Sequence, residues 1–232
     1  MPQVNITMST STMTGLLSSG SLLYAFRGVE SSDLAARPLV WRQIQYSNLT
    51  TVVWQDLYEA YTSTDPIVAN AAINPGFSVA VALGQTLNVT AGGAGTVVAG
   101  GPAGDVSILN TTQTQLTCGL SQAGPAGSSA LPYCAFPLFG SNLQQITPNE
   151  KVLLMFSTQS LPPGTVIGTA PRAPLDALLA SFSPSVLIDL TGAVERDVTY
   201  DLNAGWSWGG FTWAQRIPAG ADFVPWLIAP VS

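Results

Sequence analysis

The chain contains no histidine and only two cysteines. Without histidine there can be no Ser-His-Asp triad, no Cys-His dyad and no metal or haem site that uses an imidazole ligand. With two cysteines, four-thiolate zinc and iron–sulfur sites are excluded as well. We therefore expect no metal to take an essential part. A calcium site built from carboxylates and backbone carbonyls is the one kind that this composition leaves open.

Charge is also scarce, at 9% of residues, and its balance is acidic. Seven basic residues against thirteen acidic ones give a net charge of −6, and Lys151 is the only lysine. Nucleic-acid binding needs clustered basic side chains to displace counterions from phosphates, so this class is excluded. Docking on anionic lipid is disfavoured for the same reason. No run of 18 apolar residues is present, so we expect neither a transmembrane helix nor a membrane partner.

The first twenty residues lack a basic stretch followed by a continuous apolar block. Such a block is the mark of a secretory signal. The sequence therefore predicts a cytoplasmic location or leaderless export.

Signals of β structure dominate the rest of the chain. Short segments rich in Val, Thr, Leu and aromatic residues alternate with turns of Gly, Pro and Asn, as in β-sandwiches and barrels. We predict an all-β fold, a single-domain antiparallel β-sandwich over residues 1–232 with one short inserted helix. The expected strands are Ser21–Val29, Leu39–Ser47, Thr51–Thr62, Phe77–Thr90, Thr96–Ala99, Val106–Leu109, Gln115–Leu120, Lys151–Thr158, Thr165–Thr169, Ser185–Leu190 and Asp197–Leu202.

The inserted helix is predicted over Pro174–Phe182, where apolar residues have helical spacing and Pro174 suits the first helical position. One of the expected strands, Thr51–Thr62, is ambiguous. Its aromatic and leucine side chains also fit one helical face, but the run begins with β-branched residues, which favour a strand.

The two cysteines, Cys118 and Cys134, flank a Gly-rich loop and lie among apolar neighbours. Three interpretations are open for them, in this order: buried free thiols, a disulfide across a hairpin, and a covalent tether for a ligand.

Carboxylate catalysis remains possible, because a suitably spaced pair can hydrolyse glycosides, whereas Lys151 is expected to be a solvated lysine rather than a Schiff-base residue. The candidates are Asp56 with Glu59, and a second group formed by Asp189, Glu195, Asp197 and Asp201. No motif places any two of them across a cleft, so the prediction is a protein that is not an enzyme and has no catalytic residues.

Aromatic residues form two clusters, and they suggest where a ligand binds. Trp41 and Trp54 lie in apolar segments and are expected in the core. The other cluster has the sequence GWSWGGFTW, which predicts an aromatic hairpin around the Gly-Gly turn that lines the principal concavity. The candidate ligand-binding residues are Trp206, Trp208, Phe211, Trp213, Tyr58 and Tyr61.

Exposed aromatic faces of this kind suit three functions. They can form a pocket for a planar organic ligand, stack on sugar rings, or lie at a membrane interface.

Several segments resemble a largely uncharacterised family of small β-rich fruiting-body proteins from mushroom-forming fungi. They are LLYAFRGVESS, LVWRQIQYSNLTTVVWQDLYEAYTST, LGQTLNV, EKVLLMFST, LIDLTG and VTYDLNAGWSW. A pigment-holding oyster-mushroom chromoprotein is a candidate relative, so the resemblance implies a bound small organic chromophore. The predicted function is non-enzymatic binding of a small aromatic or apolar ligand, with a pigment as one candidate. A carbohydrate-binding lectin is the first alternative and a membrane-active cytolysin the second.

Overall fold

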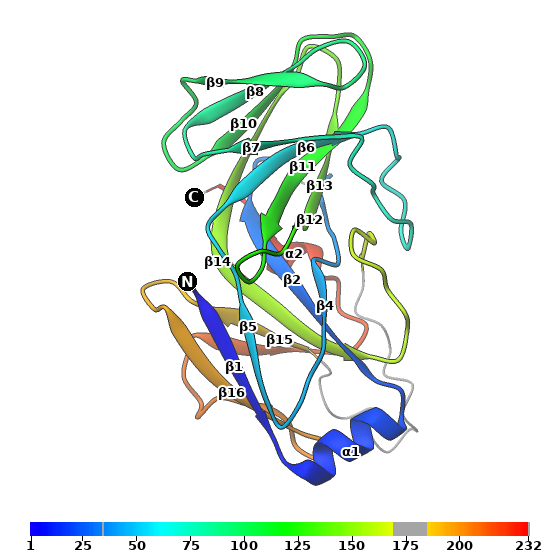
Figure 1. The fold of residues 1–232 in the computed structure, drawn as a ribbon, viewed down its shortest axis with the longest axis vertical. Helices are drawn as coiled ribbons and strands as arrows, with labels where there is room; N and C mark the ends of the chain where they lie inside the picture. Colours follow the sequence, from blue (N-terminus) through cyan, green and yellow to red (C-terminus); the bar gives the residue numbers. More distant parts are fainter. Residues whose placement is uncertain (34, 169–184, 232) are drawn as a thin grey trace.

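The computed structural model describes residues 1–33, 35–168 and 185–231, and strands dominate it (Figure 1). Within these residues the strands form three sheets, of four, nine and six strands, and the pairing is mostly antiparallel. The predicted all-β, sandwich-like fold is therefore confirmed. The helix expected at Pro174–Phe182 lies outside the described residues.

The four-stranded sheet is built around the first strand of the chain. Its strand order is β17 (Gly205–Ser207), β16 (Glu195–Asp201), β1 (Gln3–Met8) and β5 (Leu49–Val53). Strand β1 runs parallel to β16 and antiparallel to β5. Its side chains alternate, so that Val4, Ile6 and Met8 are buried while the residues between them face outward. The helix α1 (Thr10–Ser18) follows, and Ser9 caps it by accepting a hydrogen bond from the Thr12 amide at 3.1 Å.

The nine-stranded sheet has the longest strand of the described structure at its centre. Its path is β18 (Ala214–Ile217), β15 (Ser185–Asp189), β14 (Leu143–Ser157), β10 (Val106–Asn110), β8 (Gln85–Val89) and β9 (Gly95–Ala99). Beside β14 lies β2 (Leu22–Glu30), which also pairs with β4 (Arg42–Ile44) and β19 (Ile228–Ala229). The β14–β2 register shifts between Pro148 and Val152, which marks a bulge.

The six-stranded sheet is antiparallel throughout its described pairings. It consists of β3 (Arg37–Pro38), β13 (Cys134–Leu138), β11 (Leu116–Ala123), β6 (Tyr58–Ser63) and β7 (Phe77–Val81), with β12 (Ala130–Pro132) beside β11. A short helix, α2 (Val224–Leu227), lies against β2. Cys118 and Cys134 are buried free thiols on β11 and β13, which confirms the first of the three interpretations.

Strand β14 serves both halves of the molecule (Figure 1). Its first residues pair with β10, and its last residues pair with β15 and β2. In the lower half, Phe156 of β14 stacks on Trp206 of β17 at 5.5 Å and packs against Tyr200 of β16 at 4.5 Å. The largest hydrophobic cluster includes residues from all three sheets.

Several expected strands differ from the observed ones. Thr51–Thr62 is neither one strand nor a helix, because the chain leaves β5 after Val53 and re-enters a different sheet as β6 at Tyr58. Phe77–Thr90 is divided by a turn at Gly84, whose φ of 82° suits glycine. Of Leu39–Ser47 only β4 is a strand, and within the described part of Thr165–Thr169 there are only isolated bridges.

Replacing Gly28 by alanine tests the fit between β2 and the bulge in β14. A Cβ atom there would overlap Asn149 Oδ1 and lie 3.1 Å from Lys151 Cβ. We expect Gly28→Ala to lower the free energy of unfolding by about 1–3 kcal/mol, as other overpacked sites do. Urea denaturation measures it. Gly168→Ala is the control, since a Cβ there meets no atom of the described residues within 4 Å; equal stability of the two variants would contradict the close approach.

Candidate functional site

The expected aromatic hairpin at Trp206–Trp213 is wrong. Strand β17 pairs with β16 in the four-stranded sheet, whereas β18 pairs with β15 in the nine-stranded sheet. Gly209 and Gly210 do form a turn, each with a φ of 75°, but this turn carries the chain from one sheet to the other. Trp206 has no exposed surface and packs between Phe156 and Tyr200, so it offers no face to a ligand.

The other aromatic residues of this segment lie nearer the surface. Trp208 is half-buried, and its indole Nε1 donates to the Phe211 carbonyl at 2.7 Å. Phe211 is 62% exposed, and its ring stacks on Trp213 with centroids 6.2 Å apart. The Arg196 guanidinium lies 4.9 Å from the Trp213 ring centre. None of these residues lines either of the two cavities described below.

The two candidate tyrosines both lie on β6 but have different surroundings. Tyr61 is fully buried, and its hydroxyl donates to the Cys134 carbonyl at 2.8 Å. Gly119 leaves room for this ring, because a Cβ there would lie 2.8 Å from the Tyr61 hydroxyl. Tyr58 is also buried, but it forms part of the wall of a surface cleft. Of the six candidate ligand-binding residues, Tyr58 alone lines a cavity described here.

Alanine substitutions distinguish the buried aromatic residue from the exposed one. Trp206→Ala should lower the free energy of unfolding by about 3–5 kcal/mol, because it empties a packed site. Phe211→Ala should change it by no more than about 0.5 kcal/mol, as expected at an exposed position. Urea denaturation followed by circular dichroism measures both. A small loss for Trp206→Ala would show that this indole is not part of the core.

The cleft that Tyr58 lines, which we call the acidic cleft, has a volume of about 830 Å³. It lies where β6, β7, the β11–β12 connection and the bulge of β14 meet. Its lining residues are Asp56, Leu57, Tyr58, Glu59, Ala80, Val81, Ala82, Leu83, Gln85, Ala123, Ser128, Ser129, Ala130, Pro148 and Glu150. A volume of this size is typical of sites for small organic molecules.

Three carboxylates line the acidic cleft, and no basic residue does. Glu59 accepts a hydrogen bond from the Ser78 hydroxyl at 2.6 Å. Burial raises the pKa of Glu150, and the charges of Asp56 and Asp189 add to this, while Arg27 opposes it. Glu150 Oε2 is buried and has no hydrogen-bond partner among the described residues. The cleft is therefore an electronegative site with unused acceptor capacity.

Arg27 lies fully buried close to this cleft. Its Nε donates to Gln122 Oε1 and its Nη2 to the Asn149 carbonyl, each at 3.0 Å, and its guanidinium lies 4.2 Å from the Trp54 ring centre. Burial lowers its pKa, and the negative charges of Glu150 and Asp56 oppose this effect. Its Nη1 has no partner among the described residues, nor does the buried hydroxyl of Tyr133.

Replacing Arg27 by methionine tests whether this cation holds the surrounding elements together. Arg27→Met leaves Gln122 Oε1 and the Asn149 carbonyl without their donor, so we expect a loss of about 3–5 kcal/mol in the free energy of unfolding. The control is Arg196→Met at the surface, which should cost less than about 1 kcal/mol. Thermal and urea unfolding measure both. If Arg27→Met left the free energy of unfolding unchanged, the hydrogen bonds of Arg27 would only offset the cost of burying its charge.

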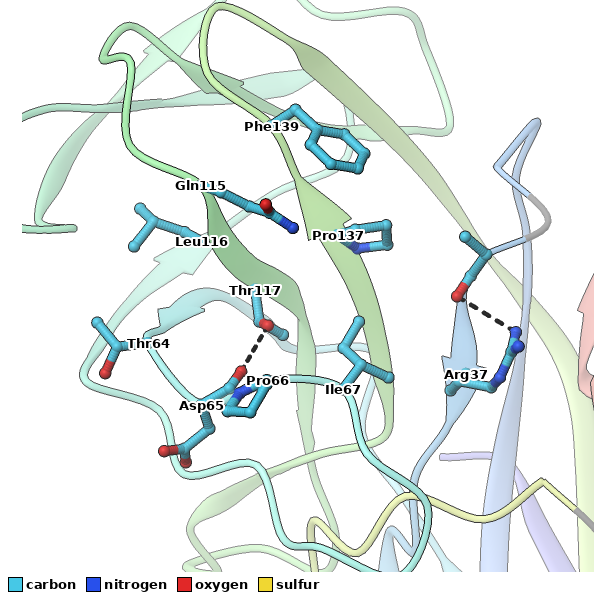
Figure 2. A pocket seen from close by; sticks show the side chains of 11 residues that line it. Arg37, Thr64, Asp65, Pro66, Ile67, Gln115, Leu116, Thr117, Pro137 and Phe139 are labelled. Atoms are coloured by element: carbon cyan, nitrogen blue, oxygen red, sulfur yellow. Dashed lines mark hydrogen bonds between the residues drawn. The ribbon is translucent and has the colours of Figure 1, made fainter.

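A second cavity, of about 600 Å³, lies on the six-stranded sheet (Figure 2). Several of its polar groups are engaged within the chain. The Asp65 carboxylate accepts from the backbone and side-chain amides of Asn74 at 2.8 and 3.1 Å, which lowers its pKa. Thr117 donates to the Asp65 carbonyl, and Arg37 donates to the Ala35 carbonyl (Figure 2). This cavity therefore shows fewer groups ready for a ligand than the acidic cleft.

The two carboxylate groups named from the sequence have different places. Asp56 and Glu59 both line the acidic cleft, together with Glu150, which sequence reasoning missed. The carboxylates of the other group form hydrogen bonds within the fold. Asp189 and Asp201 accept from backbone amides in the turns that follow them, and Glu195 and Asp197 accept from Asn5.

Comparisons with known proteins found no match to this chain: no family model, no curated protein and no solved structure. The resemblance to fruiting-body proteins is thus carried by the sequence segments alone. No helix of the described residues is long and apolar enough to cross a membrane. In the same residues no group of three or more Cys, Asp or Glu side chains is placed to hold a metal ion, and the expectation that no metal takes part stays a prediction.

Proposed function

We propose that this protein binds a small, partly apolar organic molecule in the acidic cleft, without catalysing a reaction on it. The observation that carries the proposal is the lining of the cleft, which combines apolar surface with Glu150, a carboxylate whose Oε2 lacks a hydrogen-bond partner among the described residues. Such a combination is typical of small-molecule sites, where apolar contacts supply affinity and a few polar groups fix orientation.

The apolar part of the site is unusually open to solvent. Leu57 and Leu83, which line the cleft, are 61% and 47% exposed, whereas Tyr58 and Val81, which are paired across β6 and β7, are buried lining residues. A bound hydrocarbon body would cover these side chains and gain about 25 cal/mol for each Å² of apolar surface removed from water. A pigment with a planar ring system is one ligand of this class.

The polar part supports binding because buried polar atoms without partners are costly. Glu150 lines the cleft, and one of its carboxylate oxygens, Oε2, is buried without a partner among the described residues. A hydrogen-bond donor brought in by a ligand, or water held beside it, would satisfy this carboxylate.

One observation favours the lectin alternative. The exposed ring of Phe211, supported from within by Trp213, is a flat apolar platform of the kind on which sugar rings stack. Binding of one glycan class that is lost in Phe211→Ala and kept in a variant with a blocked cleft would assign the function to this platform.

Blocking the acidic cleft tests the proposed function. Nile red is a neutral, planar dye whose fluorescence rises in apolar surroundings, and we expect it to bind the unmodified protein. Ala80→Trp fills the cleft from β7 and should abolish this signal. Val98→Trp places the same side chain on the exposed edge strand β9, outside the cleft, and should leave the signal unchanged. No binding of Nile red, or equal binding by both variants, would contradict the proposal. The absorbance of protein from its native source would show whether the ligand is a pigment.

A further inference from the structure

The charge of the acidic cleft distinguishes among small organic ligands. Asp56, Glu59 and Glu150 approach it from three segments: the β5–β6 connection, β6 and the bulge of β14. No arginine or lysine lines it. An anionic ligand would meet three like charges there, whereas a cationic one would meet three opposite charges.

Glu150 is the carboxylate best prepared for a cation. Its Oε2 is buried without a partner among the described residues, while Glu59 already accepts from Ser78. Arg27, the buried cation nearby, directs its bonded N–H groups at Gln122 and the Asn149 carbonyl rather than at Glu150. The Glu150 carboxylate therefore has acceptor capacity that the described side chains do not use, in a partly desolvated place where charge-assisted hydrogen bonds are strong.

We propose that the ligand of the acidic cleft is an organic amine, with its ammonium group on Glu150, in the negative potential to which Asp56 and Glu59 contribute, and its hydrocarbon body over Leu57 and Leu83. This inference rests on the proposed function and adds the chemical class of the ligand. The acidic side chains select the charge, and the exposed leucines select an apolar body over a bare inorganic cation.

A matched series of naphthalene compounds tests the charge. The probes are 2-(1-naphthyl)ethylamine, 2-(1-naphthyl)ethanol and 3-(1-naphthyl)propionate, measured by isothermal titration calorimetry at neutral pH. We expect the amine to bind about tenfold to a hundredfold more tightly than the alcohol, the range that a charge-assisted hydrogen bond provides. We expect the propionate to bind more weakly than the alcohol.

Variants test whether the preference for the amine over the alcohol arises in the acidic cleft. Glu150→Gln keeps the shape of the side chain and removes its charge, so it should reduce the preference for amine over alcohol about tenfold or more. Asp56→Asn, at an exposed position, should reduce it less and provides a second test if Glu150→Gln folds poorly. Glu30→Gln, on β2 outside the cleft, is the control and should bind like the unmodified protein.

The pH dependence gives an independent readout. A naphthylethyl trimethylammonium probe keeps its charge at every pH, so its affinity follows the carboxylates. Because the pKa of Glu150 is raised by burial, affinity should be full at neutral pH and should fall with acidification earlier than for an ordinary glutamate. The charged groups acting on Glu150 are Arg27, Asp56 and Asp189, and the neutral Tyr58 and Tyr133, whose own pKa values its charge helps to raise, also face it. In Glu150→Gln this early fall should disappear.

The outcomes separate the two proposals. Equal binding of amine and alcohol, with Nile red bound and displaced by both, would overturn the amine proposal and leave the apolar site standing. A preference for the amine that Glu150→Gln and Asp56→Asn both leave unchanged would also overturn it. Failure of Nile red and of all three naphthalene probes would remove the proposed function itself.

Discussion

The cation–π contact between the Arg27 guanidinium and the Trp54 ring lies where the nine-stranded and six-stranded sheets meet. Arg27 belongs to β2 of the nine-stranded sheet, and Gln122, which accepts from it, belongs to β11 of the six-stranded sheet. Trp54 comes from the segment that carries the chain from β5 to β6, and its ring also meets Trp41 edge-on at 6.4 Å. A cation without water must have its hydrogen bonds supplied by protein, so these elements can occupy only a narrow range of positions around it.

The bulge of β14 follows from the same need to supply hydrogen bonds to the buried Arg27. The Asn149 carbonyl turns toward Arg27 instead of continuing the ladder with β2, and Gly28 leaves the space that this needs. Bulges bend a strand and redirect its side chains. Here the bend lies between the part of β14 that pairs with β10 and the part that pairs with β15, and it places Glu150 at the wall of the acidic cleft. The acidic cleft thus depends on the bulge in β14, which brings Glu150 to its wall.

Much of the fold could be predicted from local pattern. The segments that form β2, β10, β11 and β15 are recognisable in the sequence, as is the burial of Trp41 and Trp54. Strand β1 also alternates, but it was not among the predicted strands. Sheet membership could not be predicted, because it depends on pairing between distant segments. The Gly209–Gly210 turn shows the limit: local signals indicate that the chain turns there, but they do not show that β17 and β18 enter different sheets.

The candidate site was less predictable than the fold for a related reason. Aromatic side chains attract attention as ligand contacts, yet most of those chosen serve the packing between sheets, as Trp206 does. Asp56 and Glu59 could be named as a pair because they are close in sequence. Glu150 joins them in the folded protein only through the register shift between β14 and β2. No local sequence pattern predicts this shift. Distant carboxylates of this kind become a site only once the sheets are assembled.

The parallel pairing of β1 with β16 has a consequence for how the protein is made. Asn5 on β1 hydrogen-bonds to Glu195 on β16, 190 positions later in the sequence. Strand β1 can pair with β5 early, but its other edge stays open until β16, at Glu195–Asp201, has left the ribosome. Contacts between such distant segments close large loops and slow the search for the native topology. During that delay, an unpaired edge exposes backbone amides and carbonyls to other nascent chains. Assembly of the four-stranded sheet is therefore the stage at which a chaperone would have most to protect.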